Sequence, residues 1–225
     1  MSTAAGNPSG GRASTAHDPS LARGGPAAWR AVDLITLAIV GVALGVAFWG
    51  WDNSLYQVLN VASKAFPPSG ELLLGVWLLP AVVGALIVRR PGAALLTELV
   101  AAAVENLLGN QWGTGVLISG LLQAAGVEIA VALFAWRRWR PSVAMLAGAL
   151  SAVFAIVLYE WWTYVAEYGW DWKIVYLACG VISGIVIAGL GGWALVQALA
   201  RAGALSAFPP GHELLAARAR ARDGS

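Results

Sequence analysis

The chain alternates long apolar runs with short polar or charged breaks. Six of these runs approach the roughly 20 residues that an α-helix needs to cross a bilayer. We read the runs as residues 32–49, 72–88, 92–108, 116–136, 143–165 and 174–200. The third run differs from the others because Glu98 and Glu105 lie inside it. The pattern therefore predicts six transmembrane helices, five of them almost free of charge.

The positions of the basic residues test that count. With six spans, all the arginine-bearing breaks fall on one side of the membrane, and Lys64 and Lys173 fall on the other. Positive charge accumulates in cytoplasmic loops, so this asymmetry predicts that both termini are cytoplasmic. The arginines concerned are Arg30, Arg89, Arg90, Arg137, Arg138, Arg140 and Arg201.

Composition supports a membrane protein and excludes several other classes. Hydrophobic residues make up 59% of the 225 residues and charged residues 12%, about half the charge of a soluble domain. The single Cys179 excludes a disulfide scaffold. A net charge of +2 gives no indication of nucleic-acid binding. We predict an all-α membrane protein, with six transmembrane helices in a compact bundle, in the plasma membrane.

Three regions are expected along the chain. Residues 1–29, rich in Gly, Ser, Ala and Pro, predict a disordered tail. Residues 30–202 form the membrane domain, and residues 203–225 a cytoplasmic tail whose arginines either contact anionic lipid headgroups or are simply solvated. Apolar residues at helical spacing over 55–66 predict a short interfacial helix. That helix is either a lid over an outward-facing cavity or a connector resting on the membrane.

Polar side chains within the apolar runs are the candidates for chemistry, because each carboxylate at membrane depth costs at least about 2.5 kcal/mol. Glu98 and Glu128 lie in the inner half, where they are either protonated or bonded to a neighbouring helix. The outer set combines carboxylates, amides and aromatic rings, which suit a flat, nitrogen-rich, cationic ligand. The alternatives are hydrogen bonds between helices and, for the tryptophans, an interfacial belt. The outer set comprises Glu105, Asn106, Trp112, Gln123, Glu160 and Tyr164.

Small residues recur at helical spacing in two runs. They are Gly41, Ala43, Gly45 and Ala47 in the first run, and Gly180, Gly184, Ala188 and Gly192 in the last. Small side chains allow helices to approach closely in a membrane. Both stripes are interpreted first as internal packing, and the first run also as a docking face for another membrane subunit.

Three segments carry a resemblance to a known family. They are PGAALLTE (91–98), ENLLGNQWG (105–113) and LQAAGVE (122–128). This part of the chain resembles the YkoE family, the substrate-capture (S) components of energy-coupling factor (ECF) transporters. The resemblance implies six helices with cytoplasmic ends and a ligand, thiamine or its hydroxymethylpyrimidine moiety, bound near the outer face. The motif positions that it carries across are Glu98, Glu105, Gln111, Trp112, Gln123 and Glu128.

The family also implies partners. Transport would use a separate membrane coupling subunit and ATPase subunits, and docking would involve the A-x-x-x-A pattern that Ala43 and Ala47 match. No cofactor and no catalytic residue are expected. The sequence has no P-loop motif, and His17 and His212 lie in the tails, which excludes an intramembrane histidine-metal site.

Three functions remain to be compared. The first is a non-enzymatic binding and translocation subunit. The second is a stand-alone proton-coupled carrier in which Glu98, Glu105 and Glu128 form a relay. The third is an intramembrane enzyme with paired carboxylates, for which the sequence supplies neither nucleophile nor metal.

Overall fold

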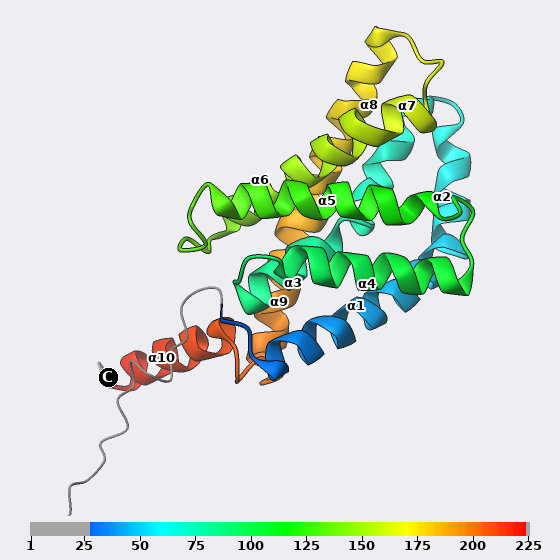
Figure 1. Ribbon diagram of the computed structural model, residues 1–225. Helices are drawn as coiled ribbons and strands as arrows, with labels where there is room; N and C mark the ends of the chain where they lie inside the picture. Colours follow the sequence, from blue (N-terminus) through cyan, green and yellow to red (C-terminus); the bar gives the residue numbers. More distant parts are fainter. Residues whose placement is uncertain (1–27, 224–225) are drawn as a thin grey trace, which may run out of the picture.

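The computed structural model describes residues 28–223, and every regular element within that range is helical (Figure 1). Residues 1–27 of the expected N-terminal tail lie outside the described part of the chain, so its disorder stays a prediction. Five helical stretches are long and apolar enough to cross a membrane: Ala31–Asp52, Pro67–Val88, Gly115–Ala132, Pro141–Thr163 and Trp170–Arg201.

The third apolar run is also a helix, α4 (Ala93–Leu108), which at 16 residues is shorter than these five stretches. It packs against α1 (Ala31–Asp52) and α5 (Gly115–Ala132). A Cβ atom at Gly45 would lie only 2.6 Å from the Ala101 carbonyl oxygen. Glycine in the first run is therefore what lets α1 approach α4 so closely.

The second apolar run is not one continuous α-helix. It begins with a 3₁₀-helix, η1 (Pro67–Val76), and continues after a break at Trp77 and Leu78 as α3 (Leu79–Val88). Pro80 stands at the start of α3, and its missing N–H removes one of the bonds that would continue the preceding turn. The expectation of one uniform helix over 72–88 is corrected in this respect.

Each of the last two apolar runs also changes from an α-helix to a π-helix and back. The fifth comprises α6 (Pro141–Ala155), the π-helix η2 (Ile156–Glu160) and α7 (Trp161–Thr163). The sixth comprises α8 (Trp170–Ser183), the π-helix η3 (Gly184–Gly191) and α9 (Gly192–Arg201).

The two runs meet at Gly148 and Gly184. A Cβ at Gly148 would lie 2.8 Å from the Gly184 carbonyl carbon, and Ala188 is fully buried nearby in η3. The small-residue stripe of the last run is confirmed as internal packing.

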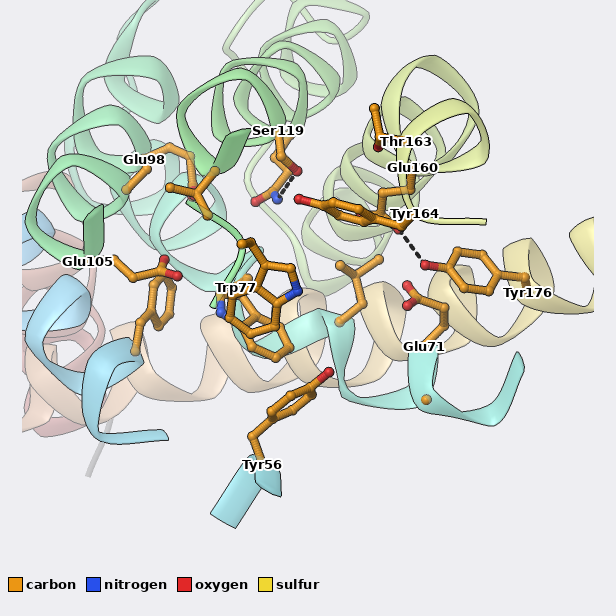
Figure 2. Close-up of a pocket in the computed structure, with 17 residues that line it drawn as sticks. Tyr56, Glu71, Trp77, Glu98, Glu105, Ser119, Glu160, Thr163, Tyr164 and Tyr176 are labelled. Atoms are coloured by element: carbon orange, nitrogen blue, oxygen red, sulfur yellow. Dashed lines mark hydrogen bonds between the residues drawn. The ribbon is translucent and has the colours of Figure 1, made fainter. Parts of the chain in front are cut away.

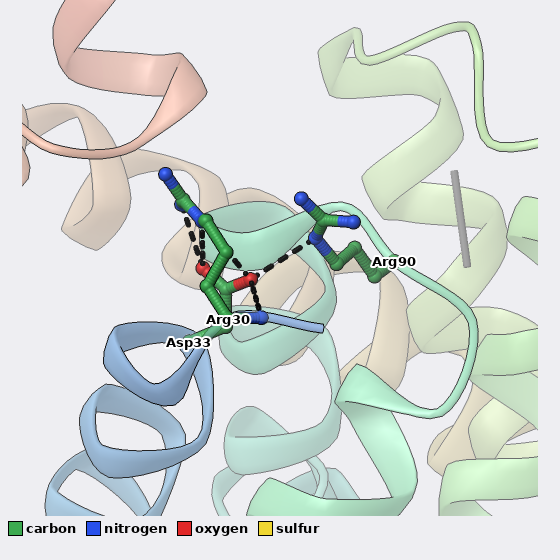
Figure 3. Close-up of polar contacts among 3 residues, drawn as sticks. All are labelled: Arg30, Asp33 and Arg90. Atoms are coloured by element: carbon green, nitrogen blue, oxygen red, sulfur yellow. Dashed lines mark hydrogen bonds and ion pairs between the residues drawn. The ribbon is translucent and has the colours of Figure 1, made fainter. Parts of the chain in front are cut away.

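The start of α1 is fixed by a buried ion-paired aspartate (Figure 3). Asp33 is 0% exposed; its Oδ1 lies 2.6 Å from Arg30 Nη2, and its Oδ2 lies 3.1 Å from Arg90 Nε. The Arg30 backbone N–H also donates to Asp33 Oδ2 over 3.0 Å. This cluster connects the start of α1 to the turn between α3 and α4. We call this end of the molecule the arginine end.

The C-terminal segment, expected as a tail over residues 203–225, contains a helix. Residues Pro209–Asp223 form a helix, α10, which leads away from the bundle (Figure 1). Arg89 forms a two-bond ion pair with Glu213, and Phe208 is buried just before the helix. The double proline at 209–210 is a helix-start signal that the sequence analysis did not use.

Candidate functional site

A cavity of about 470 Å³ lies at the end of the bundle opposite the arginine end. Its walls come from α1, α2 (Leu55–Ser63), η1, α4, α5, η2 with the segment that follows it, and α8 (Figure 2). The volume falls within the range of small-molecule sites. The expected interfacial helix over 55–66 is present as α2, and its Tyr56 lines the cavity, which favours the lid interpretation over a connector.

The cavity is acidic. Four glutamates line it, and no Lys, Arg or His side chain is among its lining residues. Because carboxylates removed from water are stable only when they gain a partner, an unneutralised set of this kind is energetically expensive. The four are Glu71, Glu98, Glu105 and Glu160.

Glu105 is buried with little compensation. It is 2% exposed, and its buried Oε1 atom has no hydrogen-bond partner among the described residues. Asp52, the last residue of α1, lies beside it and also interacts with Trp77. Two acidic groups thus meet where α1 and α4 border the cavity. Within the described residues, three of their buried oxygen atoms have no hydrogen-bond partner: Asp52 Oδ1, Asp52 Oδ2 and Glu105 Oε1.

A second acidic pair lies across the cavity. The Tyr176 hydroxyl donates to Glu160 Oε2 over 3.0 Å, and Glu71 interacts with both of these side chains. The Glu71 Oε2 atom is buried and has no hydrogen-bond partner in the described part of the chain. In Figure 2, Glu105 lies on one side of Trp77, and Glu71, Glu160 and Tyr176 lie on the other.

Glu98 has a different role, because it accepts a backbone hydrogen bond. Its Oε2 atom accepts the Ala81 N–H over 2.9 Å, which satisfies one of the free donors at the start of α3. Gln123 joins it when its amide is turned so that its oxygen accepts from Ser119 Oγ at 2.9 Å. The amide nitrogen then lies 3.3 Å from Glu98 Oε1 and 3.2 Å from the Trp77 carbonyl oxygen.

Three aromatic rings form one wall. The ring centroids of Tyr56 and Trp77 are 5.1 Å apart, those of Trp77 and Trp112 are 5.3 Å apart, and those of Tyr56 and Trp112 are 5.5 Å apart. Burial, and then the negative charge of Glu71, raises the pKa of Tyr56, so its phenol is a neutral hydrogen-bond donor at pH 7. Such a wall offers ring faces to a flat or cationic ligand.

The structure brings most of the sequence-predicted residues together. Six of the nine line the cavity: Glu98, Glu105, Trp112, Gln123, Glu160 and Tyr164. Gln111 is exposed, and its Oε1 accepts from Gln57 Nε2 over 3.4 Å, which links α2 to the loop after α4. Asn106 is half-buried beside Glu105 but is not among the lining residues.

Glu128 also lies away from the cavity lining. Its Oε1 accepts the Ala94 N–H over 3.0 Å and so caps the start of α4. A carboxylate at a helix N-terminus is stabilised by the free N–H groups and the helix dipole. Of the two alternatives considered for the inner carboxylates, this contact supports the bond to a neighbouring helix.

Sequence reasoning missed seven of the cavity's polar and aromatic residues. They are Phe48, Tyr56, Glu71, Trp77, Ser119, Thr163 and Tyr176. Glu71 stands just before the expected start of the second span, and it is the only carboxylate between Asp52 and Glu98. An isolated acidic residue next to an apolar run was the signal that could have identified Glu71 as a candidate site residue. Trp77 had no such signal, because a tryptophan in an apolar run is unremarkable.

The small residues of α1 divide between two faces. Gly41 and Gly45 are buried against α4, whereas Ala43 and Ala47 are exposed on the surface of the bundle. Residues four apart share a face of a helix, while residues two apart do not. The glycine pair is therefore used for internal packing, and the alanine pair is accessible from outside.

Comparisons with known proteins agree with these features. Residues 32–154 match the family model described as the permease component of an ABC-type cobalt transport system. The chain is 31% identical over 196 residues to YkoE of Bacillus subtilis (strain 168), which carries the name HMP/thiamine permease; the match covers 87% of this chain and 96% of YkoE. A crystal structure of an S component of an ECF transporter matches with a TM-score of 0.81 and 31% identity, covering 88% of this chain and 99% of that one. These relatives are transporter subunits and not enzymes.

Proposed function

The chain belongs to the YkoE family of ECF-transporter S components, and from this premise we propose what it carries and how. Its ligand is thiamine or the hydroxymethylpyrimidine moiety of thiamine, captured in the cavity from outside the cell. A separate membrane coupling subunit and ATPase subunits then drive its delivery inward.

The observation that carries the ligand assignment is the 470 Å³ cavity with four glutamates, an aromatic wall and no basic lining residue. Thiamine combines a permanently positive thiazolium ring with an aminopyrimidine. The cation is attracted by the carboxylates and ring faces. The amino group and ring nitrogen of the pyrimidine can form two hydrogen bonds with a carboxyl or carboxamide group such as Glu105 or Gln123.

Cobalt, which the matched family model names, is a poorer fit to this donor set. Among residues 28–223, no three His, Cys, Asp or Glu side chains are grouped so that they could hold a metal ion. Imidazole is a common ligand of divalent first-row transition metals, and no histidine is among the lining residues. An organic cation matches the aromatic wall better than a metal ion does.

For the topology, we infer six membrane crossings with the arginine end and both termini in the cytoplasm. The sixth crossing is α4, which at 1.5 Å per residue spans about 24 Å and lies between α1 and α5. Single cysteines in a Cys179→Ser background test this orientation. An impermeant thiol reagent on intact cells is expected to label Glu167→Cys and not Arg138→Cys; the opposite pattern would invert the topology.

For the coupling subunit, the docking face is the exposed side of α1 around Ala43 and Ala47. Ala43→Leu is expected to stop uptake in cells and to leave thiamine binding by the purified protein unchanged, because the new side chain blocks close helix contact. A leucine at the exposed Val42, which as the adjacent residue in the helix points to a different face, is the control. Full uptake by the Ala43→Leu protein would exclude this face.

The proton-coupled carrier has less support. Of its three relay residues, Glu128 does not line the cavity, and both Glu98 and Glu128 accept backbone hydrogen bonds at helix starts. Uptake that persists without the ATPase and collapses with an uncoupler would reverse this preference.

The deciding experiment is a tryptophan-fluorescence titration of the purified protein with thiamine, hydroxymethylpyrimidine and riboflavin. Trp77 and Trp112 line the cavity, so an occupying ligand is expected to change their emission. Saturable responses to thiamine or hydroxymethylpyrimidine, with none to riboflavin, support the proposal. A response to riboflavin alone would overturn it.

A further inference from the structure

We propose that the cavity selects the unphosphorylated vitamin and excludes its phosphate esters, and that Glu71 and Glu160 determine this specificity. The inference rests on the proposed function, since it concerns the same cavity. It assigns a role to an acidic pair at the end of the cavity away from Glu105.

The two ends of the cavity are acidic in the same way. Glu105, with Asp52 beside it, lies on one side of Trp77, and Glu71, Glu160 and Tyr176 lie on the other (Figure 2). A ligand stacked near Trp77 would therefore meet carboxylates at both of its ends. A molecule with hydrogen-bond donors at both ends and positive charge between them is complementary to this arrangement.

Each end has an acceptor that the protein leaves unsatisfied. Glu105 is 2% exposed with its Oε1 unpartnered, and the Glu71 Oε2 atom is also buried without a partner within the described residues. A buried acceptor without a hydrogen bond costs about 1–3 kcal/mol, and more when it is charged. Donors carried by the ligand would recover that cost at both ends.

The cavity offers little to a phosphate. No Lys, Arg or His lines it. At the start of α3, beside the lining residue Glu98, free N–H groups would normally attract an anion. There the Ala81 N–H is already bound by Glu98 Oε2 at 2.9 Å. A phosphate would thus meet four carboxylates and an occupied helix terminus.

Thiamine matches the two-ended arrangement through its own chemistry. Its aminopyrimidine carries donors at one end, its hydroxyethyl group carries a hydroxyl donor at the other, and the thiazolium cation lies between them. Phosphorylation replaces that hydroxyl donor with a group of about two negative charges. The change falls at one of the two acidic ends, and repulsion between like charges then disfavours binding.

The experiment is a paired titration of the purified protein with thiamine and thiamine monophosphate. For the wild-type protein, we expect the Kd of the monophosphate to be at least about 100-fold higher, because like charges facing each other cost several kcal/mol. Glu71→Gln and Glu160→Gln each replace one ionisable carboxyl group by a neutral amide of the same shape, so each should reduce the Kd ratio about tenfold. The control is Glu167→Gln, an exposed glutamate outside the cavity, which should leave the ratio unchanged.

The outcomes separate this inference from the proposed function. Wild-type Kd values within threefold of each other, or a ratio unchanged in both glutamine variants, overturn the inference and leave the proposed function standing. Absence of both thiamine and hydroxymethylpyrimidine binding overturns the proposed function itself. Each variant is compared only if it elutes from gel filtration like the wild type. Having two variants at separate positions keeps the test decisive if one of them misfolds.

Discussion

The arginine end and the cavity both contain buried carboxylates, but the protein pairs the carboxylate with arginines only at the arginine end. At the arginine end, Asp33 is 0% exposed and each of its oxygens lies within ion-pair distance of an arginine. In the cavity, Glu71 and Glu105 each keep an unpartnered oxygen, and no basic residue lines the walls. A buried charge that is paired contributes to the fold, whereas one left unpaired indicates a partner that is not part of the chain.

Glu98 and Glu128 fall between these extremes. Each accepts one backbone N–H at the start of a helix, Glu98 at α3 and Glu128 at α4. Glu98 also faces the cavity and Glu128 does not. The comparison therefore orders the buried acids by the extent to which the protein itself neutralises them, and that order predicts how each variant divides its effect between stability and binding.

The largest effect on stability is expected for Asp33→Asn. Removing one partner of a buried ion pair costs about 3–5 kcal/mol, and we expect about 2–4 kcal/mol here because Arg30 is half exposed. Thermal unfolding of the purified protein measures the loss, and the Kd for thiamine should stay within about twofold of wild type. Glu213→Gln is the control, since Glu213 is 59% exposed and its loss should cost less than the loss of the fully buried Asp33. An Asp33→Asn protein as stable as wild type would contradict the conclusion that the paired Asp33 stabilises the fold.

Glu105→Gln should have the opposite effect: weaker thiamine binding with little change in stability. We expect thiamine binding to weaken about 10- to 100-fold, which corresponds to about 1.4–2.8 kcal/mol. Stability should be unchanged or slightly higher, because an uncompensated buried carboxylate has been removed. The fluorescence titration and thermal unfolding, run beside Glu167→Gln, measure the two quantities. Unchanged affinity would remove Glu105 from the site.

The smallest effect is expected for Glu128→Ala, which tests the intermediate class. Loss of a side-chain acceptor at a helix start costs about 1 kcal/mol, so the melting temperature should fall modestly and thiamine affinity should not change. Glu128→Gln keeps an oxygen that can accept the Ala94 N–H and should lie closer to wild type. A tenfold loss of affinity in Glu128→Ala would instead assign Glu128 to the ligand.

The helical segments could be predicted because apolar runs and arginine positions follow directly from the cost of placing polar groups in lipid. The changes from α-helix to 3₁₀- or π-helix could not be predicted. The 3₁₀ start at Pro67–Val76 and the π-helix at Gly184–Gly191 differ from an α-helix in their hydrogen-bond partners, and apolar composition does not encode that choice. Just after the break at Trp77, the Ala81 N–H donates to Glu98, a residue of another helix.

The site could be predicted only in part, for a related reason. Depth along each span correctly grouped Glu105, Gln123 and Glu160, since depth depends on position in the sequence alone. The pairing of Glu71 with Glu160 depends on how η1 and the fifth run pack, which no local pattern specifies. Helical spacing likewise separates Gly41 and Gly45 from Ala43 and Ala47, but only packing against α4 reveals which pair faces inward.

The glycine contact between α6 and η3 affects how the cavity walls can move. A methyl group at Gly184 would lie 2.9 Å from the Gly148 carbonyl carbon, so the two backbones touch with no side chain between them. Helices in such direct contact lack the loose, reorientable side chains that let neighbouring helices slide. We expect the wall that carries Glu160 and Tyr176 to move as one rigid unit. The opposite wall at α2 is joined to the loop after α4 by the hydrogen bond between the Gln57 and Gln111 side chains.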